Sequence, residues 1–193
     1  MSVLVIYAHP NPQSFNHAIF EQVVRGLKDK GQPFNAIDLY KEGFDPVLVH
    51  NREKKRSEMK TDPELATYRR LIEEADHLIF IYPIWWYGMP AILKGFIDRV
   101  FASGFAYQYK KNIPFGLLKD KSATVIYTLD SPGFYERLIR HNLEWQSVKG
   151  PIFHFCGIRP VRRLVFSSVR TSSERRREKW LEKIYQYCLS KIN

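Results

Sequence analysis

Short apolar runs alternate with amphipathic stretches along the whole chain. The apolar runs have the length of β-strands and are mostly rich in branched residues, which is typical of strands buried on both faces. We predict strands at Val3 to Ala8, Phe34 to Leu39, His77 to Tyr82, Ser122 to Thr128 and Val161 to Phe166. The second of these is the more polar one and is predicted at an edge. Strands alternating with helices predict one parallel sheet with helices on both faces.

The stretches between the strands have apolar residues at helical spacing. A first helix is predicted from Ser14 to Lys30, with Gly31 placed as a C-cap glycine. Further helices are predicted over Glu64 to Glu74, from Pro90, from about Phe134 to Cys156 with a break at Gly150-Pro151, and after a cap at Thr171 or Ser172. The polar, aperiodic segment between them, Tyr40 to Pro63, is predicted to be a long loop.

Five strands with helical crossovers are typical of the flavodoxin-like doubly wound sheet, a three-layer α/β fold with strand order 2-1-3-4-5. No repeat or linker divides the chain, so one domain over residues 1–193 is predicted. In such a sheet, ligands bind beyond the carboxyl ends of the strands, where the strand order reverses. The loops at 9–16, 83–88 and 129–134 are therefore the candidates for a binding site.

The first of these loops leads directly into the first helix and reads HPNPQSFN from His9 to Asn16. Amide groups at a helix N-terminus suit a phosphate, and Ser14 and Asn16 add short polar side chains. The loop lacks the glycines of GxGxxG and of a Walker A loop, which argues against the Rossmann and P-loop NTPase folds. The alternative is that Ser14 or Asn16 only caps the helix, and the segment alone favours neither interpretation.

The second loop is aromatic and reads YPIWWYGMP from Tyr82 to Pro90. Exposed aromatic side chains of this size need a flat apolar partner, and a planar ring such as isoalloxazine would suit them. A dimer interface or plain core explains them equally well. The third loop, Asp130-Ser131-Pro132-Gly133, is explained by turn chemistry alone, but it would lie beside the second loop.

Three segments carry a resemblance to a known family. They are YPIWWYGMPAILKGFIDRVFASGFAY from Tyr82 to Tyr107, HPNPQSFNHA from His9 to Ala18, and HFCG from His154 to Gly157. In this order they closely resemble the NAD(P)H quinone oxidoreductases of the flavodoxin-like superfamily. The resemblance implies a flavoprotein with FMN, or alternatively FAD. It would pass a hydride from NAD(P)H through the flavin to a quinone-like acceptor by a ping-pong two-electron mechanism.

The family's motifs imply roles for individual residues. The flavin phosphate site is implied to include His9, Ser14, Phe15, Asn16 and Ala18. The flavin ring is implied to contact Pro83, Ile84, Trp85, Trp86 and Tyr87. Thr128 matches the family's threonine after the fourth strand, but the family's Thr-Thr-Gly-Gly is replaced here by Thr128, Leu129, Asp130 and Ser131. Thr128, Asp130, Ser131 and Gly133 are still implied to contact the edge of the flavin. Tyr135 and His141 have the spacing of a tyrosine and histidine that stabilise the reduced flavin, and Tyr107 and Tyr109 match substrate-side tyrosines that close the site from the partner subunit.

The charge balance raises the question of nucleic acid. The 30 basic and 20 acidic residues give a net charge of +10, with dense runs at Arg175-Arg176-Arg177 and Lys54-Lys55-Arg56. No nucleic-acid module surrounds either run, so we favour a solvated surface that also attracts anionic ligands such as nucleotide phosphates. Cys156 and Cys188 form neither a disulfide framework nor a metal pair, and no metal site is predicted. With no apolar run of membrane-span length and no leader, a cytoplasmic protein is expected.

Other functions remain open on the same residues. They are a nitro- or azo-reductase, an ancillary regulatory subunit of a potassium efflux system, and a flavodoxin-type electron carrier, although such carriers are commonly acidic. A homodimer is predicted, since family members pair through the aromatic region and its aromatics exceed what one helix face needs for its own core. That series is Phe96, Phe101, Phe105, Tyr107 and Tyr109.

Overall fold

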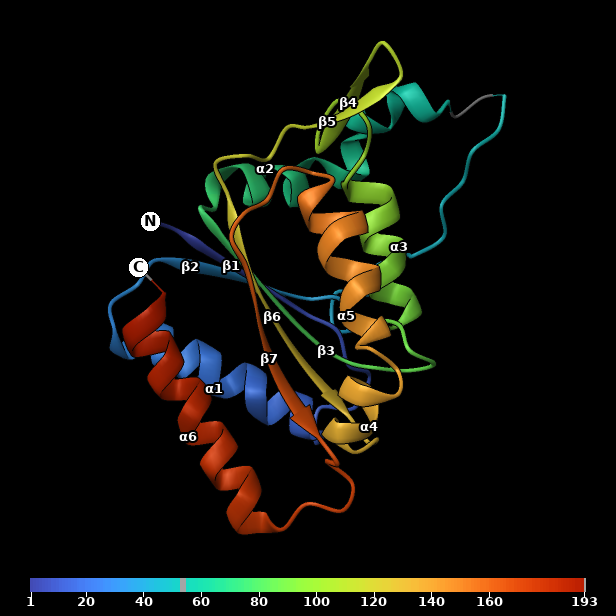
Figure 1. Cartoon of the computed structure of the whole chain (residues 1–193). Coiled ribbons are helices and arrows are strands. Elements are labelled where there is room, and N and C mark those ends of the chain that lie inside the picture. The colour runs from blue at the N-terminus through green and yellow to red at the C-terminus, as the bar shows by residue number, and fades with distance from the viewer. Residues whose placement is uncertain (53–54, 193) are drawn as a thin grey trace.

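Five parallel strands form one sheet in the computed structural model, with the order β2-β1-β3-β6-β7 (Figure 1). The structure describes residues 1–52 and 55–192. The strands of the sheet are β1 (Val3–Tyr7), β2 (Phe34–Asp38), β3 (His77–Pro83), β6 (Ser122–Leu129) and β7 (Val161–Ser167). Because β6 and β7 are the fourth and fifth strands of this sheet, the predicted order 2-1-3-4-5 and the predicted flavodoxin-like fold class are confirmed.

Helices cover both faces of the sheet (Figure 1). They are α1 (Phe15–Asp29), α2 (Ala66–Glu74), α3 (Ala91–Val100), α4 (Gly133–Leu138), α5 (Leu143–Val148) and α6 (Glu174–Lys191). Shorter turns are the 3₁₀ helices Arg56–Thr61 and Pro63–Leu65 and the π-helix Lys149–His154. The helices α1 and α6 lie on one face, and α2, α3 and α5 bury side chains on the other. None of the helices in the described ranges is long and apolar enough to cross a membrane.

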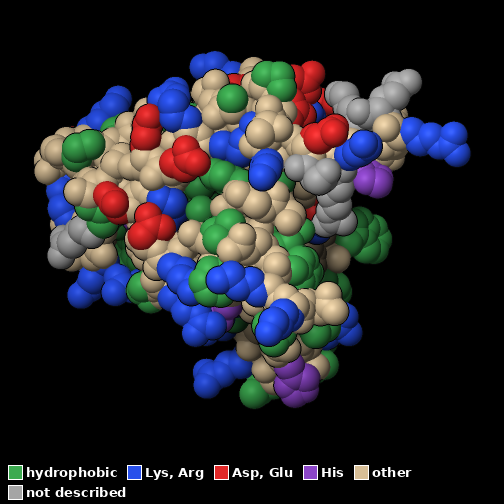
Figure 2. Space-filling view, turned by 90° about the horizontal axis from the view of Figure 1, so that it is seen from above, with side chains coloured by type: hydrophobic (Ala, Val, Ile, Leu, Met, Phe, Trp, Pro, Cys, Tyr) green, Lys and Arg blue, Asp and Glu red, His purple; other side chains and the backbone are tan. Residues whose placement is uncertain are grey.

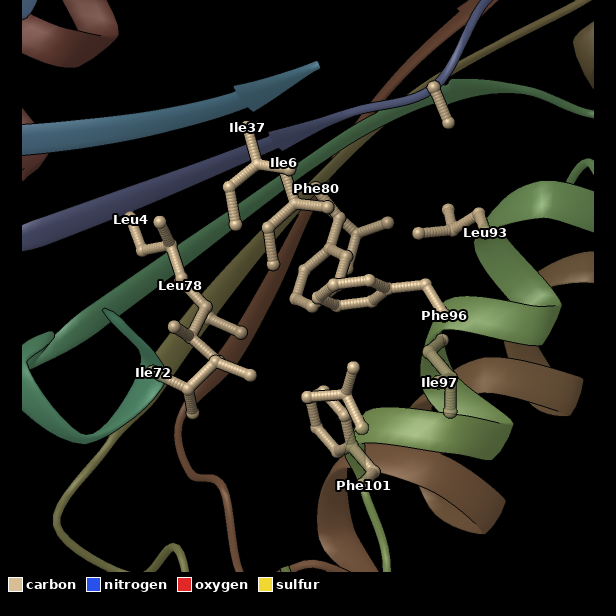
Figure 3. Close-up of a cluster of buried hydrophobic side chains, with 14 of the residues drawn as sticks. Leu4, Ile6, Ile37, Ile72, Leu78, Phe80, Leu93, Phe96, Ile97 and Phe101 are labelled. Atoms are coloured by element: carbon tan, nitrogen blue, oxygen red, sulfur yellow. The ribbon is translucent and has the colours of Figure 1, made fainter. Parts of the chain in front are cut away.

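The alternation of side chains along β1 explains why the sheet needs helices on both faces. Val3 and Val5 pack with α1 and α6, whereas Leu4 and Ile6 belong to the cluster that contains α3. Figure 3 shows how Leu93, Phe96 and Ile97 of α3, and Phe101 directly after it, point toward the strand residues of this second cluster. Full burial of one such side chain stabilises the fold by about 1.5–3 kcal/mol.

The segment from Tyr40 to Pro63, predicted as a long loop, packs against α3 and is hydrogen-bonded to it. Pro46 packs so closely on Gly95 that a Cβ there would lie 2.3 Å from the Pro46 carbonyl oxygen. One turn later, the buried Arg99 donates to the Asp45 carbonyl oxygen, and its Nη2 lies 2.9 Å from Oε2 of Glu64. The 3₁₀ helix Arg56–Thr61 lies within this segment and Pro63–Leu65 begins at its last residue, so the prediction of a long loop is wrong from Arg56 on.

Two predicted helix boundaries are wrong. The final helix is capped by Ser173, whose Oγ accepts from the Arg176 amide, while the Ser172 hydroxyl donates to the Val169 carbonyl in the preceding turn. The predicted break at Gly150-Pro151 is instead a π-helix, in which the Phe155 amide bonds the Gly150 carbonyl. A wide turn of this kind absorbs a proline, which has no amide hydrogen to bond the preceding turn.

The helical stretch breaks earlier, between α4 and α5. His141 and Asn142 both have left-handed backbones there, each with φ of 53°. Such a conformation costs free energy for a residue with a side chain and ends a right-handed helix. The antiparallel hairpin β4 (Tyr107–Lys110) and β5 (Ile113–Gly116) is a further element that the sequence pattern did not predict.

The aromatic series of the predicted dimer region divides between core and surface. Phe96 and Phe101 are buried in the chain's own core, so the prediction that the series exceeds the needs of the core is wrong for these two. Phe105 and Tyr107 are half-buried against the same core. Tyr109 is 59% exposed and is the member that leaves a large aromatic surface uncovered.

Basic side chains are spread over the surface. On the face shown in Figure 2, Lys and Arg lie on many separate parts of the molecule, with Asp and Glu among them. Arg176 of the predicted dense run stacks on Trp180, with its Cζ 4.8 Å from the ring centroid. Lys54 of the other predicted run lies outside the described residues. These observations agree with the interpretation of a solvated charged surface.

Both cysteines are expected to resist alkylation in the folded protein. Cys156 and Cys188 are buried, and burial raises the pKa of each thiol to about 12, so the reactive thiolate is scarce at neutral pH. Iodoacetamide at pH 7.5 should add no mass to the native protein within an hour, whereas both thiols should react in urea. Rapid modification of the native chain would contradict this burial.

Candidate functional site

The three loops singled out in the sequence meet at the carboxyl ends of the strands. The Asn16 side-chain amide donates to Oγ1 of Thr128 at 2.7 Å, which joins the start of α1 to the end of β6. The Ile84 amide donates to the Thr128 carbonyl oxygen at 2.8 Å, which joins the second loop to the third. The predicted site is therefore one place in space, at the end of the sheet where α4 also lies (Figure 1).

The N-terminus of α1 offers amide groups at this edge. Ser14 is the N-cap, and its Oγ accepts from the His17 amide at 3.1 Å, so the capping alternative holds for Ser14. The helix itself provides no acceptor for the next amides, those of Phe15 and Asn16. The Phe15 ring turns to the other side and packs on Trp180, while Ala18 is partly buried in the same helix.

Asn16 lies in the first turn of α1 and is not its cap, so the capping alternative is wrong for this residue. Its side chain is 4% exposed, and its Nδ2 bonds Thr128. Its Oδ1 is buried without a hydrogen-bond partner among the described residues. A buried amide oxygen without a partner costs free energy, so a donor on a bound ligand would complete the site.

His9 lies between the first and second loops. Its Nδ1 accepts from the Asn11 amide at 3.0 Å, and its ring centroid is 5.7 Å from that of Trp85. Burial lowers the pKa of His9 below its ordinary value, so the ring is neutral at pH 7. A neutral His9 leaves the amides of α1 as the main positive potential for an anion there.

The second loop holds its aromatic side chains away from the core. Trp85 and Gly88 exchange two backbone hydrogen bonds of 2.9 Å, and between them Trp86 and Tyr87 have φ of 51° and 60°. Positive φ at both central positions is unusual for bulky residues and is maintained only when the surroundings impose it. The turn leaves the Trp86 side chain 100% exposed. The corner is therefore open to a ligand, and the alternative that these residues form plain core is wrong for Trp86.

A small cleft lies between the second and third loops. It has a volume of about 240 Å³ and is lined by Ile84, Trp86, Tyr87, Leu129, Asp130, Ser131 and Glu136. We call this space the ring cleft. Its third-loop wall is rigid, because Asp130 accepts from the Arg170 amide at 2.9 Å and the Ser131 hydroxyl donates to Oε1 of Glu136. Pro83 is buried at the end of β3 and does not line the cleft.

Tyr135 and His141 differ in their relation to the ring cleft. Tyr135 neighbours Tyr87, and the pKa of Tyr87 is raised, first by partial burial, with Arg140 opposing the rise. The Arg140 guanidinium carbon lies 4.3 Å from the centroid of the Tyr87 ring. His141 is exposed, and its carbonyl accepts from the Gln146 side chain at 2.6 Å. Gly133 begins α4, where a Cβ would lie 2.9 Å from Oγ of Ser167.

Tyr107 and Tyr109 line a different groove. It has a volume of about 400 Å³ and lies between α3, the hairpin strand β4 and the π-helix. The two rings meet edge to face with centroids 5.9 Å apart, and Tyr107 also packs on Phe155. Within one chain the structure does not bring them to the lining of the ring cleft.

Two side chains at the site were not identified from the sequence. Glu136 lines the ring cleft and is buried, and Arg140 covers Tyr87 one helical turn further on. Both follow Tyr135 in a stretch that looks like an ordinary charged helix face. Their spacing of four residues was the only available signal, because it places them on one side of a helix.

Comparison with known proteins agrees with this geometry. The family described as having a flavodoxin-like fold matches residues 1–188. An uncharacterized NAD(P)H oxidoreductase of Haemophilus influenzae is 31% identical over 100% of this chain and 96% of its own length. NAD(P)H dehydrogenase [quinone] 1 of Cavia porcellus is 34% identical over 80% of this chain, and the match spans 64% of that relative. The crystal structure of Smu.1420 from Streptococcus mutans has a TM-score of 0.93 and 44% identity, covering 98% of this chain and 99% of that one.

The parallel sheet and its order place this protein among the flavodoxin-like α/β proteins, with the exposed Trp86 at the candidate site. The chain belongs to the NAD(P)H quinone oxidoreductase family of flavodoxin-like proteins, as the resemblance of its sequence indicated. Family membership places it among oxidoreductase enzymes.

Proposed function

We propose that the chain is a flavin-dependent NAD(P)H oxidoreductase that passes a hydride from NAD(P)H through bound FMN to a quinone-like acceptor by a ping-pong mechanism. The observation that carries this proposal is the ring cleft beneath the exposed Trp86, with the amides of α1 beside it. The buried, unpartnered Oδ1 of Asn16 supports a ligand with hydrogen-bond donors at the same edge. The named NAD(P)H oxidoreductases among the relatives support the same reaction class.

Each part of the site has a task in this proposal. The amides at Phe15 and Asn16 would hold the phosphate, and Trp86 and Tyr87 would hold the ring against Leu129. When bound, the flavin supplies the two-electron redox chemistry that side chains lack. Tyr135 and His141 stay the predicted groups that donate hydrogen bonds to the site, since a neutral hydroxyl or a protonated imidazole stabilises negative charge.

Flavin binding is the first test. Protein purified from cells should be yellow, or should take up added FMN, and its flavin absorbance should bleach on anaerobic addition of NADPH or NADH. Mass spectrometry of the flavin released by heat should give FMN, and release of FAD would correct that part of the proposal. Protein that takes up neither flavin would overturn the proposed function.

Removing the exposed ring of Trp86 should weaken flavin binding without weakening the fold. Because the side chain is 100% exposed, Trp86→Ala should leave the unfolding midpoint unchanged. Loss of one aromatic contact costs about 0.5–1.5 kcal/mol, so the Kd for FMN should rise by about two- to thirteenfold. Fluorescence titration measures the Kd, with Val47→Ala as the control, because Val47 is exposed and lines neither the ring cleft nor the hairpin. Equal Kd values for the two variants would remove Trp86 from the site.

A homodimer is part of the proposal. Tyr109, Ile113 and Phe115 of the hairpin are 59%, 69% and 38% exposed, which is a large apolar surface for one small element. Pairing through it would also let the tyrosines of one copy approach the ring cleft of the other. Sedimentation equilibrium should give twice the chain mass of 22.8 kDa, and a monomer at micromolar concentration would reject the pairing.

A further inference from the structure

A buried carboxylate in the ring cleft has one oxygen without a partner. Glu136 is 5% exposed, and its Oε1 accepts from the Ser131 hydroxyl. Its Oε2 is buried and has no hydrogen-bond partner in the described part of the chain. The backbone holds the residue in place, since the Asn142 amide donates to the Glu136 carbonyl at 2.8 Å.

The chemistry of this carboxylate oxygen limits which group can form a hydrogen bond with it. An ionised carboxylate only accepts hydrogen bonds, and a buried lone acceptor is costly to leave unpaired. Arg140, four residues on, does not satisfy it: that side chain lies over Tyr87, and its own Nε is buried without a partner. A donor on a molecule in the ring cleft, which Glu136 lines, would supply the partner that these side chains do not.

We propose that Glu136 is a cofactor-binding residue whose free oxygen accepts a hydrogen bond from a ring N–H. The inference rests on the proposed function. The oxidised isoalloxazine ring carries a single N–H, at N3 between two carbonyl groups, so N3–H is the one ring atom that fits an acceptor. Glu136 thereby selects ring ligands with an imide N–H over rings that lack one. It occupies the part of the cleft beside Ser131, where this chain departs from the family's glycine turn.

The test pairs a protein variant with a ligand variant. Glu136→Met keeps the length and volume of the side chain but has no acceptor, and 3-methyl-FMN has no N3–H. In the unaltered protein, methylation should raise the Kd by tenfold or more, as expected for a hydrogen bond to a charged group. In Glu136→Met, FMN itself should bind at least tenfold more weakly, and methylation should change the Kd less than twofold. Since methionine fills the same space, a purely steric effect of the methyl group would persist in the variant.

Two further variants separate binding from folding. Glu144→Gln alters another buried carboxylate, whose Oε1 accepts from the Tyr127 hydroxyl and whose Oε2 has no partner among the described residues. Glu144 does not line the ring cleft. This variant should keep the tenfold preference for FMN over 3-methyl-FMN. Glu136→Gln can turn its amide oxygen to the ring and should recover part of the affinity.

The outcomes distinguish this inference from the proposed function. An equal effect of methylation in the unaltered protein and in Glu136→Met would overturn the role of Glu136 while leaving flavin binding intact. Failure of the unaltered protein to bind FMN or FAD would overturn both.

Discussion

Replacing Gly95 with alanine should lower the free energy of unfolding by about 2 kcal/mol, although alanine is the better helix former. A Cβ at this position would lie 2.3 Å from the carbonyl oxygen and 2.4 Å from the Cβ of Pro46. Both atoms belong to a rigid proline and its backbone, so no side-chain rotation relieves the clash. Overpacking of this kind typically costs 1–3 kcal/mol, or more when backbone must shift, and exceeds the roughly 1 kcal/mol that alanine gains over glycine in a helix.

The matched control is Gly150→Ala, because a Cβ at Gly150 meets nothing within 4 Å. Urea unfolding should show a lower midpoint for Gly95→Ala and no decrease for Gly150→Ala, where alanine meets no clash and can only gain helix propensity. Limited proteolysis supplies a second measurement, since a displaced Pro46 exposes the chain around Asp45 to cleavage. If Gly95→Ala unfolds at the same urea concentration as the unaltered chain, the close approach of Pro46 is wrong.

This contact also changes how the family-like segment from Tyr82 to Tyr107 is understood. Its first part, at Trp86 and Tyr87, forms one wall of the ring cleft. Its second part holds the fold together: Gly95 admits Pro46, and Arg99 bonds Asp45 and Glu64. A strong sequence resemblance therefore marks both chemistry and scaffold, and only the geometry tells them apart.

The sheet and the meeting of the three candidate loops could be predicted because the strands follow from short-range rules and the loops from the strand order. Buried parallel strands are apolar at every position, as in Val3–Tyr7, and this run length separates them from helices. Once the strand order is known, the loops after β1, β3 and β6 must meet at one edge, and the bond between Asn16 and Thr128 shows that they do. Glycine placement was equally informative, since Gly31 and Gly157 have the positive φ of helix terminators.

The remaining elements depend on contacts that no local pattern records. Tyr107–Lys110 and Ile113–Gly116 are short and partly polar, and their pairing requires Gly116 to lie directly on the backbone of Cys156 and Gly157. Glu136 is a similar case: a glutamate on a charged helix is ordinarily solvated, and only the tertiary fold buries it. Long-range packing therefore determines the hairpin and the burial of Glu136, against the local preference of the sequence.

The free energy of unfolding should fall by about 3 kcal/mol between pH 7 and pH 4 because of His77 alone. The imidazole is buried, with Nδ1 2.7 Å from the Ser122 hydroxyl and Nε2 2.9 Å from the Thr124 hydroxyl. Burial, with a smaller contribution from the charge of Arg162, lowers its pKa to about 4. The unfolded chain binds the proton near pH 6.5 and the folded chain only near pH 4, so stability is complete above pH 6.5 and is lost as the pH falls through this range.

The two hydroxyl groups explain why a neutral ring is preferred. One ring nitrogen can donate and the other accept, and Thr124 is in turn 2.9 Å from the Tyr187 hydroxyl. Protonation would make both nitrogens donors and break the order of this chain of hydrogen bonds.

His77→Gln removes the titrating group and isolates its effect. At pH 7 the variant should be less stable than the unaltered protein, because it loses fitted hydrogen bonds in a buried place. The difference in unfolding free energy between the two proteins should shrink by about 3 kcal/mol from pH 7 to pH 4, and in this comparison the other titrating groups cancel. If the difference in unfolding free energy between the two proteins stays constant across this pH range, His77 is charged in the folded state at pH 5. That result would contradict its burial.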